Sequence, residues 1–338
     1  MKKILLVSLF ATMWIATSCT PSKKECESVI APERVGWLNS EYSYDGRFKE
    51  LAAAEYQPLY GDVDSVTIST YKQLLSSKKV DMERPSQEVI YDFDHRGNVV
   101  KSVYYSDGKS APDKTIIYKY DEEGRALERV EKQKMLDVEE GWITTYKYNS
   151  GGQLVESAVR YASYSEAGEL WRYEYDSNGN RIHSTLFDGA DLILWESFWK
   201  YDDGGRVVEI SRHNYEDAAY AGVTRYKYGE NGLLSQREYF WHDLDEATKI
   251  THSYSYDSDG NMIKDVEQSA GKDSYTTTYK YDERGYCIEQ ECRDKGGKFI
   301  NKVCRKYDSC RNLVEEVRYR YNEEHPSSII KYNIIYRK

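Results

Sequence analysis

The amino-acid sequence predicts an all-β protein: an antiparallel β-meander repeat array that forms a curled or spiral single sheet of about 16–20 strands built from YD-type hairpins. Three observations predict this fold. A Tyr-x-Tyr-Asp-x-x-Gly motif recurs along the chain, most copies are followed by a pair of apolar residues, and no helical period of useful length follows residue 75. Two strands per copy over about nine copies give the expected strand number.

The segment Tyr279–Gly285 shows why each copy should form a hairpin. Alternation places Tyr279 and Tyr281 on one face of a strand and Lys280 on the other. The side chain of Asp282 can accept a hydrogen bond from a backbone N–H two residues on. Gly285 suits the positive φ of a type I turn closed by a G1 bulge, where a β-branched residue would cost about 1–2 kcal/mol.

The copies recur with a nearly constant period. Successive spacings between first turn residues are 27, 28, 27, 26, 27, 28, 25, 26 and 14 residues. A fixed period in this range indicates an array of small units, each needing its neighbour to bury a face. The first turn residues are Asp94, Asp121, Asn149, Asp176, Asp202, Gly229, Asp257, Asp282, Asp308 and Asn322. The predicted turn glycines are Gly97, Gly124, Gly152, Gly179, Gly205, Gly232, Gly260 and Gly285, and Arg311 and His325 take this position in the last two copies.

Residues 1–19 have the pattern of a signal peptide. Two lysines precede an apolar run at residues 4–15, which is too short for a stable membrane span. The following Ala-Thr-Ser-Cys19 resembles the lipobox of bacterial lipoproteins, which implies that Cys19 is lipidated with acyl chains such as palmitate after cleavage. Thr20 at the next position resembles lipoproteins sorted to the outer membrane. The alternative is an ordinary secretory signal with an incidental cysteine.

Three further regions follow the signal peptide. Residues 20–35 are expected to form a polar tether, and residues 36–62 an N-terminal cap. Residues 63–338 are expected to form the YD-repeat β-sheet domain. Its first strand is expected at Val63–Leu74, and its last, at Pro326–Tyr336, is expected to protect an edge of the sheet.

The strands that enter the turns carry aromatic residues on one face, which we expect to be concave and buried. One interpretation is a structural ladder, in which each cross-strand pair contributes about 0.2–1 kcal/mol. The other is an exposed platform for sugar rings or peptide. The aromatic residues that could bind are Trp142, Tyr146, Trp171, Tyr173, Trp195, Trp199, Tyr226, Tyr254 and Tyr279.

The loops at the opposite edge from the glycine turns vary in length and composition. Function in repeat arrays is often carried by such variable loops. They are Ser165–Gly168, Phe187–Asp191, Tyr215–Ala221, Asp243–Thr248 and Asp294–Gly297.

The motif with its following Asn or Arg, as in Tyr173–Asn180 and Tyr254–Asn261, resembles the YD repeat of the RHS repeat family over residues 88–322. Members of that family use these repeats as β-sheet shells and surface structures, and very long members wrap a toxin domain. The resemblance therefore implies a shell or surface role. This sequence has a longer period, is too short for a large cocoon and shows no toxin-like C-terminal extension, so a toxin role is not expected.

The composition is acidic. The chain has 47 Lys and Arg against 57 Asp and Glu, a net charge of −10. Such a surface disfavours nucleic acid and anionic lipid as partners.

The cysteines lie at positions 19, 26, 287, 292, 304 and 310. The compartment outside the inner membrane permits disulfides. A tight register in the hairpin around Asp294–Gly297 would place Cys287 opposite Cys304, so a Cys287–Cys304 bridge is predicted, and a one-residue shift from a bulge would defeat it. Zinc is not expected at the four C-terminal cysteines because no Cys-x-x-Cys spacing occurs.

Motifs for catalysis or metal binding are not found. Asp257–Asn261 resembles the start of a calcium loop, but the final ligand position holds Gln268. Asp243, Asp245 and Glu246 are expected to form a solvated acidic loop, with weak cation binding as the alternative. The six histidines lack metal-ligand spacing, and no motif for nucleophilic catalysis or phosphate binding occurs. Acidic residues are abundant, but nothing singles out a pair for glycoside hydrolysis. No catalytic residue, cofactor or metal is therefore expected.

The sequence thus predicts a lipid-anchored YD-repeat protein of the cell envelope, a binding or structural surface module without catalysis. Its expected partners are the membrane, through the lipid, and a glycan or protein ligand. The alternatives are a carbohydrate-binding or glycan-processing surface protein that uses the Tyr/Trp face, and a component or relic of an RHS-type toxin-delivery shell. The expected location is the outer membrane.

Overall fold

The structure is a computed structural model, and it describes most of the chain. The predicted signal peptide with Cys19 lies outside the described residues, as do the predicted tether except residues 29–30 and the predicted cap up to residue 58. The acidic cluster Asp243, Asp245 and Glu246 also lies outside them. The described residues are 29–30, 59–74, 77–106, 108, 110–135, 138–163, 168–216, 221–241, 249–269, 274–322 and 324–337.

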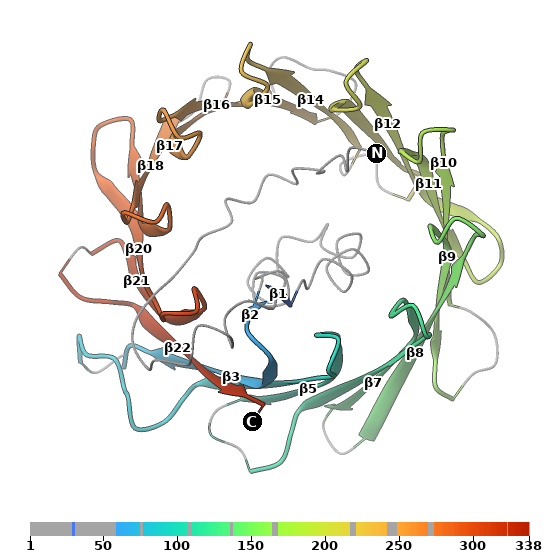
Figure 1. Cartoon of the computed structure of the whole chain (residues 1–338), viewed down its shortest axis with the longest axis horizontal. Coiled ribbons are helices and arrows are strands. Elements are labelled where there is room, and N and C mark those ends of the chain that lie inside the picture. The colour runs from blue at the N-terminus through green and yellow to red at the C-terminus, as the bar shows by residue number, and fades with distance from the viewer. Residues whose placement is uncertain are drawn as a thin grey trace. The chain divides into compact units, whose positions relative to one another are not determined.

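The described residues form β-strands joined by turns and loops, as the sequence predicts (Figure 1). The strands are β1 Val29–Ile30, β2 Leu59–Tyr60, β3 Val63–Lys72, β4 Gln87–Phe93, β5 Val99–Ser106, β6 Lys114–Tyr120, β7 Ala126–Met135, β8 Val138–Tyr148, β9 Leu154–Tyr161, β10 Glu169–Tyr175, β11 Arg181–Asp188, β12 Ile193–Tyr201, β13 Val207–Asn214, β14 Gly222–Tyr228, β15 Leu234–Trp241, β16 Ile250–Tyr256, β17 Met262–Ser269, β18 Ser274–Tyr281, β19 Cys287–Asp294, β20 Phe299–Tyr307, β21 Leu313–Arg320 and β22 Ser328–Tyr336.

The order of hydrogen-bonded strands corrects one prediction. Strands β3 to β22 pair in chain order, and β22 also pairs with β3, so the sheet is a closed barrel of 20 strands and not an open curled or spiral sheet. Figure 1 shows β22 beside β3. The antiparallel register runs from Ser328 opposite Lys72 to Tyr336 opposite Val63. Closure removes two rows of unpaired backbone groups that an open sheet would leave at its edges.

Apolar cross-strand pairs support the closure. Ile68 lies opposite Tyr332, and Val66 lies opposite Ile334. These residues belong to one hydrophobic cluster or pack against it. The alternation of apolar residues in the first and last strands of the array was visible in the sequence, but their mutual pairing was not.

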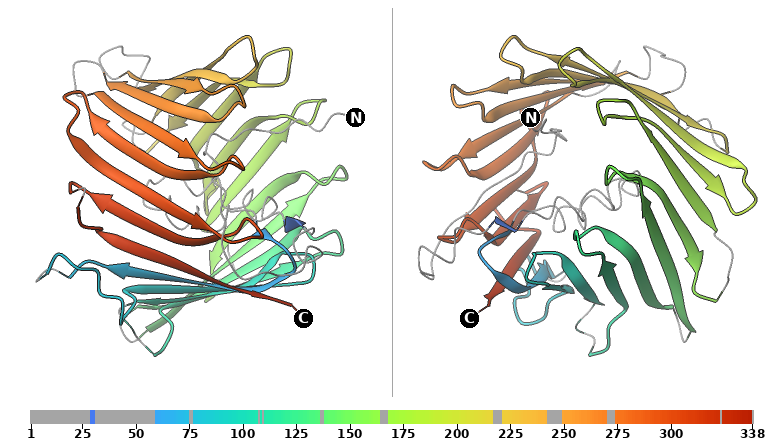
Figure 2. Two further views of the ribbon diagram at one scale, coloured as in Figure 1. Left: turned by 60° about the vertical axis from the view of Figure 1, so that its left-hand side comes forward. Right: turned by 45° about the vertical axis from the view of Figure 1, so that its right-hand side comes forward.

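Pairing within a hairpin is longer than pairing between hairpins. The hairpin β12–β13 pairs from Trp195 opposite Asn214 to Tyr201 opposite Val207, whereas β13 and β14 pair only from Arg212 opposite Gly222 to Glu209 opposite Arg225. The left view of Figure 2 shows the antiparallel strands β20–β22, in red, which also follow one another in chain order. Near the glycine turns, neighbouring hairpins therefore need side chains to join them.

The turns have the predicted geometry, which the copy at Asp202 illustrates. The Gly205 N–H donates to the Asp202 carbonyl oxygen at 2.9 Å. Asp202 Oδ1 accepts the N–H groups of Gly204 at 3.0 Å and Arg206 at 2.9 Å. The hydrogen bonds from the Arg206 backbone and guanidinium lower the pKa of the Asp202 carboxyl. The register shifts by a bulge between Lys200 and Tyr201.

All eight predicted turn glycines have a positive φ, which confirms the turn prediction. The corresponding N–H···O bonds close the turns that begin at Asp121, Asp176, Asp202, Asp257 and Asp282. The glycines are Gly97, Gly124, Gly152, Gly179, Gly205, Gly232, Gly260 and Gly285. Arg311, in the glycine position of a later copy, adopts φ 78° without being glycine.

Two compact units divide the chain. The first comprises Thr144–Tyr279 and Glu291–Phe299, and the second comprises Lys280–Gln290, Ile300–Lys338 and the described part of Thr12–Ile143, within the described ranges in each case. The second unit holds an apolar cluster, which includes Val63, Val89, Tyr91, Ile116 and Ile330. In the first unit, small polar residues such as Ser157, Ser184 and Ser197 are buried between the aromatic rings.

Gly232→Val tests the turn assignment. A Cβ at this position would meet only Arg206 Nη1, at 3.8 Å, so the cost comes from backbone strain at φ 78° and not from a clash. The free energy of unfolding in urea should fall by about 1–2 kcal/mol, and by less in Gly232→Asn, because Asn tolerates this conformation. Unchanged stability in Gly232→Val would contradict the assignment.

Candidate functional site

Tyrosine hydroxyls join neighbouring hairpins at the turn edge. The second tyrosine of a copy donates a hydrogen bond to the carbonyl of the first residue after the preceding turn. The Tyr228 hydroxyl, for example, donates to Val207 O at 2.8 Å. The same bond joins Tyr120 to Val99 (2.6 Å), Tyr175 to Leu154 (2.6 Å), Tyr201 to Arg181 (2.6 Å), Tyr256 to Leu234 (2.7 Å) and Tyr307 to Cys287 (2.5 Å). These tyrosines therefore have a structural role.

The aromatic residues predicted to bind are buried or half-buried. Tyr146 and Tyr173 are each 6% exposed. The other seven, Trp142, Trp171, Trp195, Trp199, Tyr226, Tyr254 and Tyr279, are half-buried. Their binding role stays a prediction.

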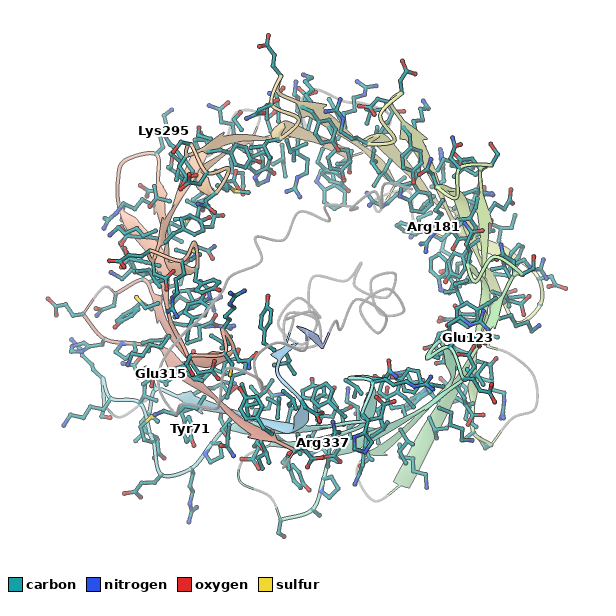
Figure 3. The ribbon with its side chains drawn as sticks, viewed as in Figure 1. Tyr71, Glu123, Arg181, Lys295, Glu315 and Arg337 are labelled. Carbon is teal, nitrogen blue, oxygen red and sulfur yellow. The ribbon has the colours of Figure 1, made fainter. Side chains whose placement is uncertain are left out.

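Around Tyr173, protein groups cover the rings. The Tyr173 hydroxyl lies 3.0 Å from Ser157 Oγ, and the Trp171 ring stacks on Tyr173 with the centroids 6.3 Å apart. The Arg181 guanidinium, labelled in Figure 3, lies 4.7 Å from the centroid of Tyr173 and 5.7 Å from that of Trp199. Burial lowers the pKa of Arg181. This part of the aromatic face is a packed cation–π cluster and not an open platform.

The other face carries a ladder of charges that the sequence analysis missed. Lys200 Nζ lies 2.7 Å from Glu209, and Arg225 Nε of the next hairpin lies 2.9 Å from the same carboxylate. Hydrogen bonds from Lys200 and then Arg225 lower the pKa of Glu209. The sequence pattern that could have predicted this ladder is a Lys followed nine residues later by a Glu. It recurs as Lys119–Glu128, Lys147–Glu156, Lys280–Glu289 and Lys306–Glu315. Because the lysines are exposed, each pair contributes only about 0–1 kcal/mol.

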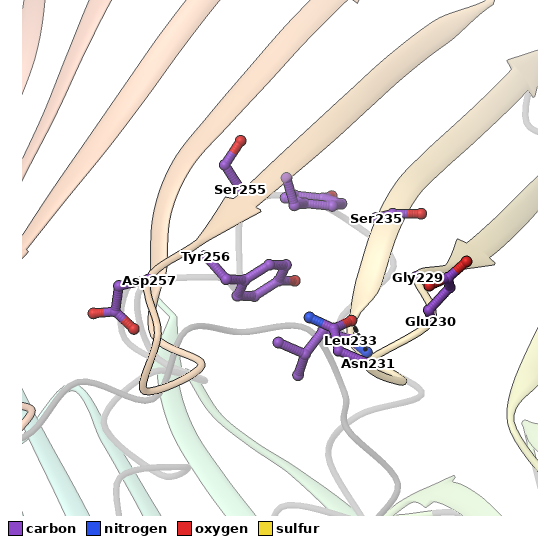
Figure 4. A pocket seen from close by; sticks show the side chains of 9 residues that line it. Gly229, Glu230, Asn231, Leu233, Ser235, Ser255, Tyr256 and Asp257 are labelled. Carbon is purple, nitrogen blue, oxygen red and sulfur yellow. Dashed lines mark hydrogen bonds between the residues drawn. The ribbon is translucent and has the colours of Figure 1, made fainter.

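A shallow hollow of about 510 Å³ lies at the turn edge of β14–β16, in the first unit (Figure 4). Function was expected at the variable loops on the other edge, but residues 164–167, 217–220 and 242–248 of that edge lie outside the described residues. The hollow is lined by Gly229, Glu230, Asn231, Leu233, Ser235, Tyr254, Ser255, Tyr256 and Asp257.

The turn at this hollow departs from the other turns. In the preceding copy, the fifth turn residue, Arg206, binds the Asp202 carboxylate at 2.7 Å. Here Gly229 has no side chain to accept such a bond and the fifth residue is Leu233. Asn231 Oδ1 instead accepts the Leu233 N–H at 3.1 Å. The Leu233 side chain is apolar and cannot make the bond that Arg206 makes, and it lines the hollow.

The turn that begins at Asp308, in the last copy but one, departs in another way. Asn312 is only 1% exposed. Its Oδ1 accepts the Tyr60 N–H at 2.8 Å, and its Nδ2 donates to Tyr60 O at 2.9 Å and lies 2.7 Å from the Tyr336 hydroxyl oxygen. The side chain thus pairs with β2 as a strand would. No pattern in the sequence had singled out Asn312 for this role.

The predicted Cys287–Cys304 disulfide does not form. Cys287 is a buried free thiol whose Sγ donates to Glu289 O at 3.2 Å. Burial raises its pKa to about 11. The physical reason is the turn at Asp294, where Gly297 adopts φ 80° as in the bulged turns, because an extra residue shifts the register of a hairpin. Cys310, for which no bridge was predicted, is disulfide-bonded.

Within the described ranges, no three His, Cys, Asp or Glu side chains gather closely enough to hold a metal ion. Nor does the described part of the chain contain a helix that is long and apolar enough to span a membrane.

The fold and its turn chemistry define an all-β array of YD-type hairpins. The sequence matches the family described as Teneurin YD-shell over residues 55–308, which is more than half of the 338-residue chain. The chain belongs to this family, and the predicted relationship to RHS/YD-repeat proteins is confirmed.

Curated relatives are similar over part of the chain. Teneurin-4 of Homo sapiens is 27% identical over 172 residues, 39% of this chain and 6% of Teneurin-4. Teneurin-3 of Danio rerio is 26% identical over 171 residues, 38% of this chain and 6% of that protein. The chain thus spans a small fraction of the length of these relatives.

Two solved structures resemble the chain at low identity. The crystal structure of TcdB2-TccC3-Cdc42 is 12% identical, with a TM-score of 0.33, and the match covers 83% of this chain and 21% of that chain. A porin-like protein from Bacteroides uniformis ATCC 8492 is 13% identical, with a TM-score of 0.36, and the match covers 81% and 98%.

Tyr228→Phe tests the hydroxyl bond between hairpins. The variant keeps the ring but leaves Val207 O without its donor, so the free energy of unfolding should fall by about 0.5–1.5 kcal/mol. Tyr71→Phe is the matched control, because no hydrogen bond of the Tyr71 hydroxyl occurs among the described residues. Equal losses in the two variants, measured by urea unfolding, would count against a specific role for the bond.

Alkaline titration tests the burial of the tyrosines. Burial, followed by the electrostatic effect of Tyr148 and Tyr201, raises the pKa of Tyr175 from 10.0 to about 12, and burial raises that of Tyr60 to about 12. The same phenols ionise near pH 10 in the unfolded chain. The stability that these two tyrosines contribute is therefore fully present below pH 10 and is lost as the pH rises from 10 to 12. Circular dichroism and tyrosinate absorbance should change together in that range. If every tyrosine ionised near pH 10 while the chain stayed folded, the raised pKa values of Tyr175 and Tyr60 would be contradicted.

Proposed function

We propose that the chain is a lipid-anchored YD-repeat module of the cell envelope, with a structural or ligand-binding role and no catalysis. One observation carries the proposal. On one face, tyrosine hydroxyls bond to carbonyls of the neighbouring copy. On the other face, Glu209 binds Lys200 of its own hairpin and Arg225 of the next. Groups used in this way build a scaffold, and among the described residues they are not left available as a repeated constellation for chemistry.

The anchor is proposed from the sequence. Residues 1–19 and the lipobox-like Ala-Thr-Ser-Cys19 support lipidation at Cys19 and a location at the outer membrane. Binding partners would be the membrane, through the lipid, and a glycan or protein ligand. The acidic balance of the chain argues against nucleic acid.

A second candidate is a component of an RHS-type shell. The closed strand order and membership of a YD-shell family favour it. Unlike the first candidate, it predicts a second polypeptide that purifies with the chain in fixed proportion. Both candidates use the barrel as a scaffold. In the first it is a structural or ligand-binding module on a lipid anchor, and in the second it is one part of a shell.

Cys19→Ala tests the anchor. The mature wild-type chain should carry acyl chains on an N-terminal Cys19 by mass spectrometry and partition with membranes, whereas the variant should lose the acyl mass and become soluble. Cys292→Ala, which removes a free thiol elsewhere, should behave as wild type. An unmodified Cys19 in the wild-type protein, or a variant that stays with the membrane, would refute the anchor.

A further inference from the structure

The hollow in Figure 4 lies where the repeat departs from its own pattern. The second residue after each turn is apolar in every other copy with a complete turn, and it is Ser235 here. The apolar residues at this position are Val100, Leu127, Val155, Ile182, Val208, Ile263, Ile288 and Val314. A single small polar residue in an otherwise apolar series indicates that the surface loses aliphatic volume at this copy.

The strand register explains why Ser235 opens a hollow. Gln236 lies opposite Ser253 in β15–β16, so Ser235 falls beside Tyr254 on the same face of the sheet. In the preceding hairpins, Glu209 lies opposite Arg225, so Val208 falls beside Tyr226. An aliphatic side chain at this position therefore lies beside the first tyrosine of the next copy. Serine removes that volume beside Tyr254, and both residues line the hollow.

The lining combines apolar surface with a few polar groups. Tyr254, Tyr256 and Leu233 supply rings and an aliphatic side chain. Asn231 uses its oxygen on the Leu233 N–H, so its amide N–H groups are left as donors. Ser235 donates to Lys227 O at 3.0 Å, so its oxygen is left as an acceptor. Small-molecule sites have this composition, with apolar walls and a few oriented polar groups.

The charges of the hollow restrict the ligand. Glu230 and Asp257 line it without any Lys or Arg, and the chain has a net charge of −10, so an anionic ligand is disfavoured. A pyranose has an apolar face of C–H groups that fits an aromatic ring, and a rim of hydroxyls that both donate and accept. We propose that this hollow binds a pyranose unit of a neutral glycan. The inference rests on the ligand-binding role proposed above and does not need the lipid anchor.

The experiment measures binding of the mature chain to cellohexaose, maltohexaose, mannohexaose and chitohexaose, with hexagalacturonate as an anionic counterpart, by calorimetry and NMR. At least one neutral oligosaccharide should bind, and hexagalacturonate should not. Ser235→Val restores the repeat pattern and fills the hollow. It should weaken binding about tenfold or more, with a Tm equal to or above that of the wild type.

Val208→Ser is the matched control. It makes the reverse change beside Tyr226, and neither Val208 nor Tyr226 lines the hollow, so the affinity should stay within about twofold of wild type. No binding of any neutral probe, wild-type affinity in Ser235→Val, or preference for hexagalacturonate would overturn the inference. Cleavage of a bound probe would refute the proposed non-catalytic function, yet loss of that binding in Ser235→Val would still support the site.

Discussion

The hydrogen bond from the second tyrosine of a copy to a carbonyl of the preceding copy, which six copies make, is the constraint on which the array depends. Strands of neighbouring hairpins pair over a shorter length than strands within a hairpin, and the shortfall lies at the turn edge. There the Tyr228 ring fills the space and its hydroxyl meets Val207 O. A residue without a hydroxyl would leave a polar backbone group unbonded, and a smaller one would leave a gap. This explains why Tyr outnumbers Phe, at 33 against 7.

Because the copies are so alike, the positions where one copy differs mark the places where the scaffold acquires something new. Two copies illustrate the opposite ways in which this happens. At the Gly229 turn, the loss of a carboxylate and of an aliphatic side chain leaves a hollow. At the Asp308 turn, a gain occurs, because the Asn312 side chain bonds to both the N–H and the carbonyl of Tyr60. The first change offers a surface to a ligand, and the second fixes a segment of the same chain.

Local chemistry made the turns predictable, because an Asp and a Gly at fixed positions specify a bulged hairpin without reference to the rest of the fold. The closure was not predictable in the same way, because the alternation of Ile330, Tyr332 and Ile334 identifies a buried face but not a partner strand. The disulfide prediction failed because the register was counted without the bulge that the motif itself implies. The charge ladder and Ser235 were visible in the sequence, but only a position-by-position comparison of the copies reveals them.

The pairing of β22 with β3 also affects how the protein can come apart. A linear array of repeats can fray from either end, one unit at a time, because each terminal unit has a single neighbour. A closed array has no terminal unit, so no unit can detach unless the ladders on both of its sides break. The barrier to unfolding, and not only the equilibrium, is raised by such a connection.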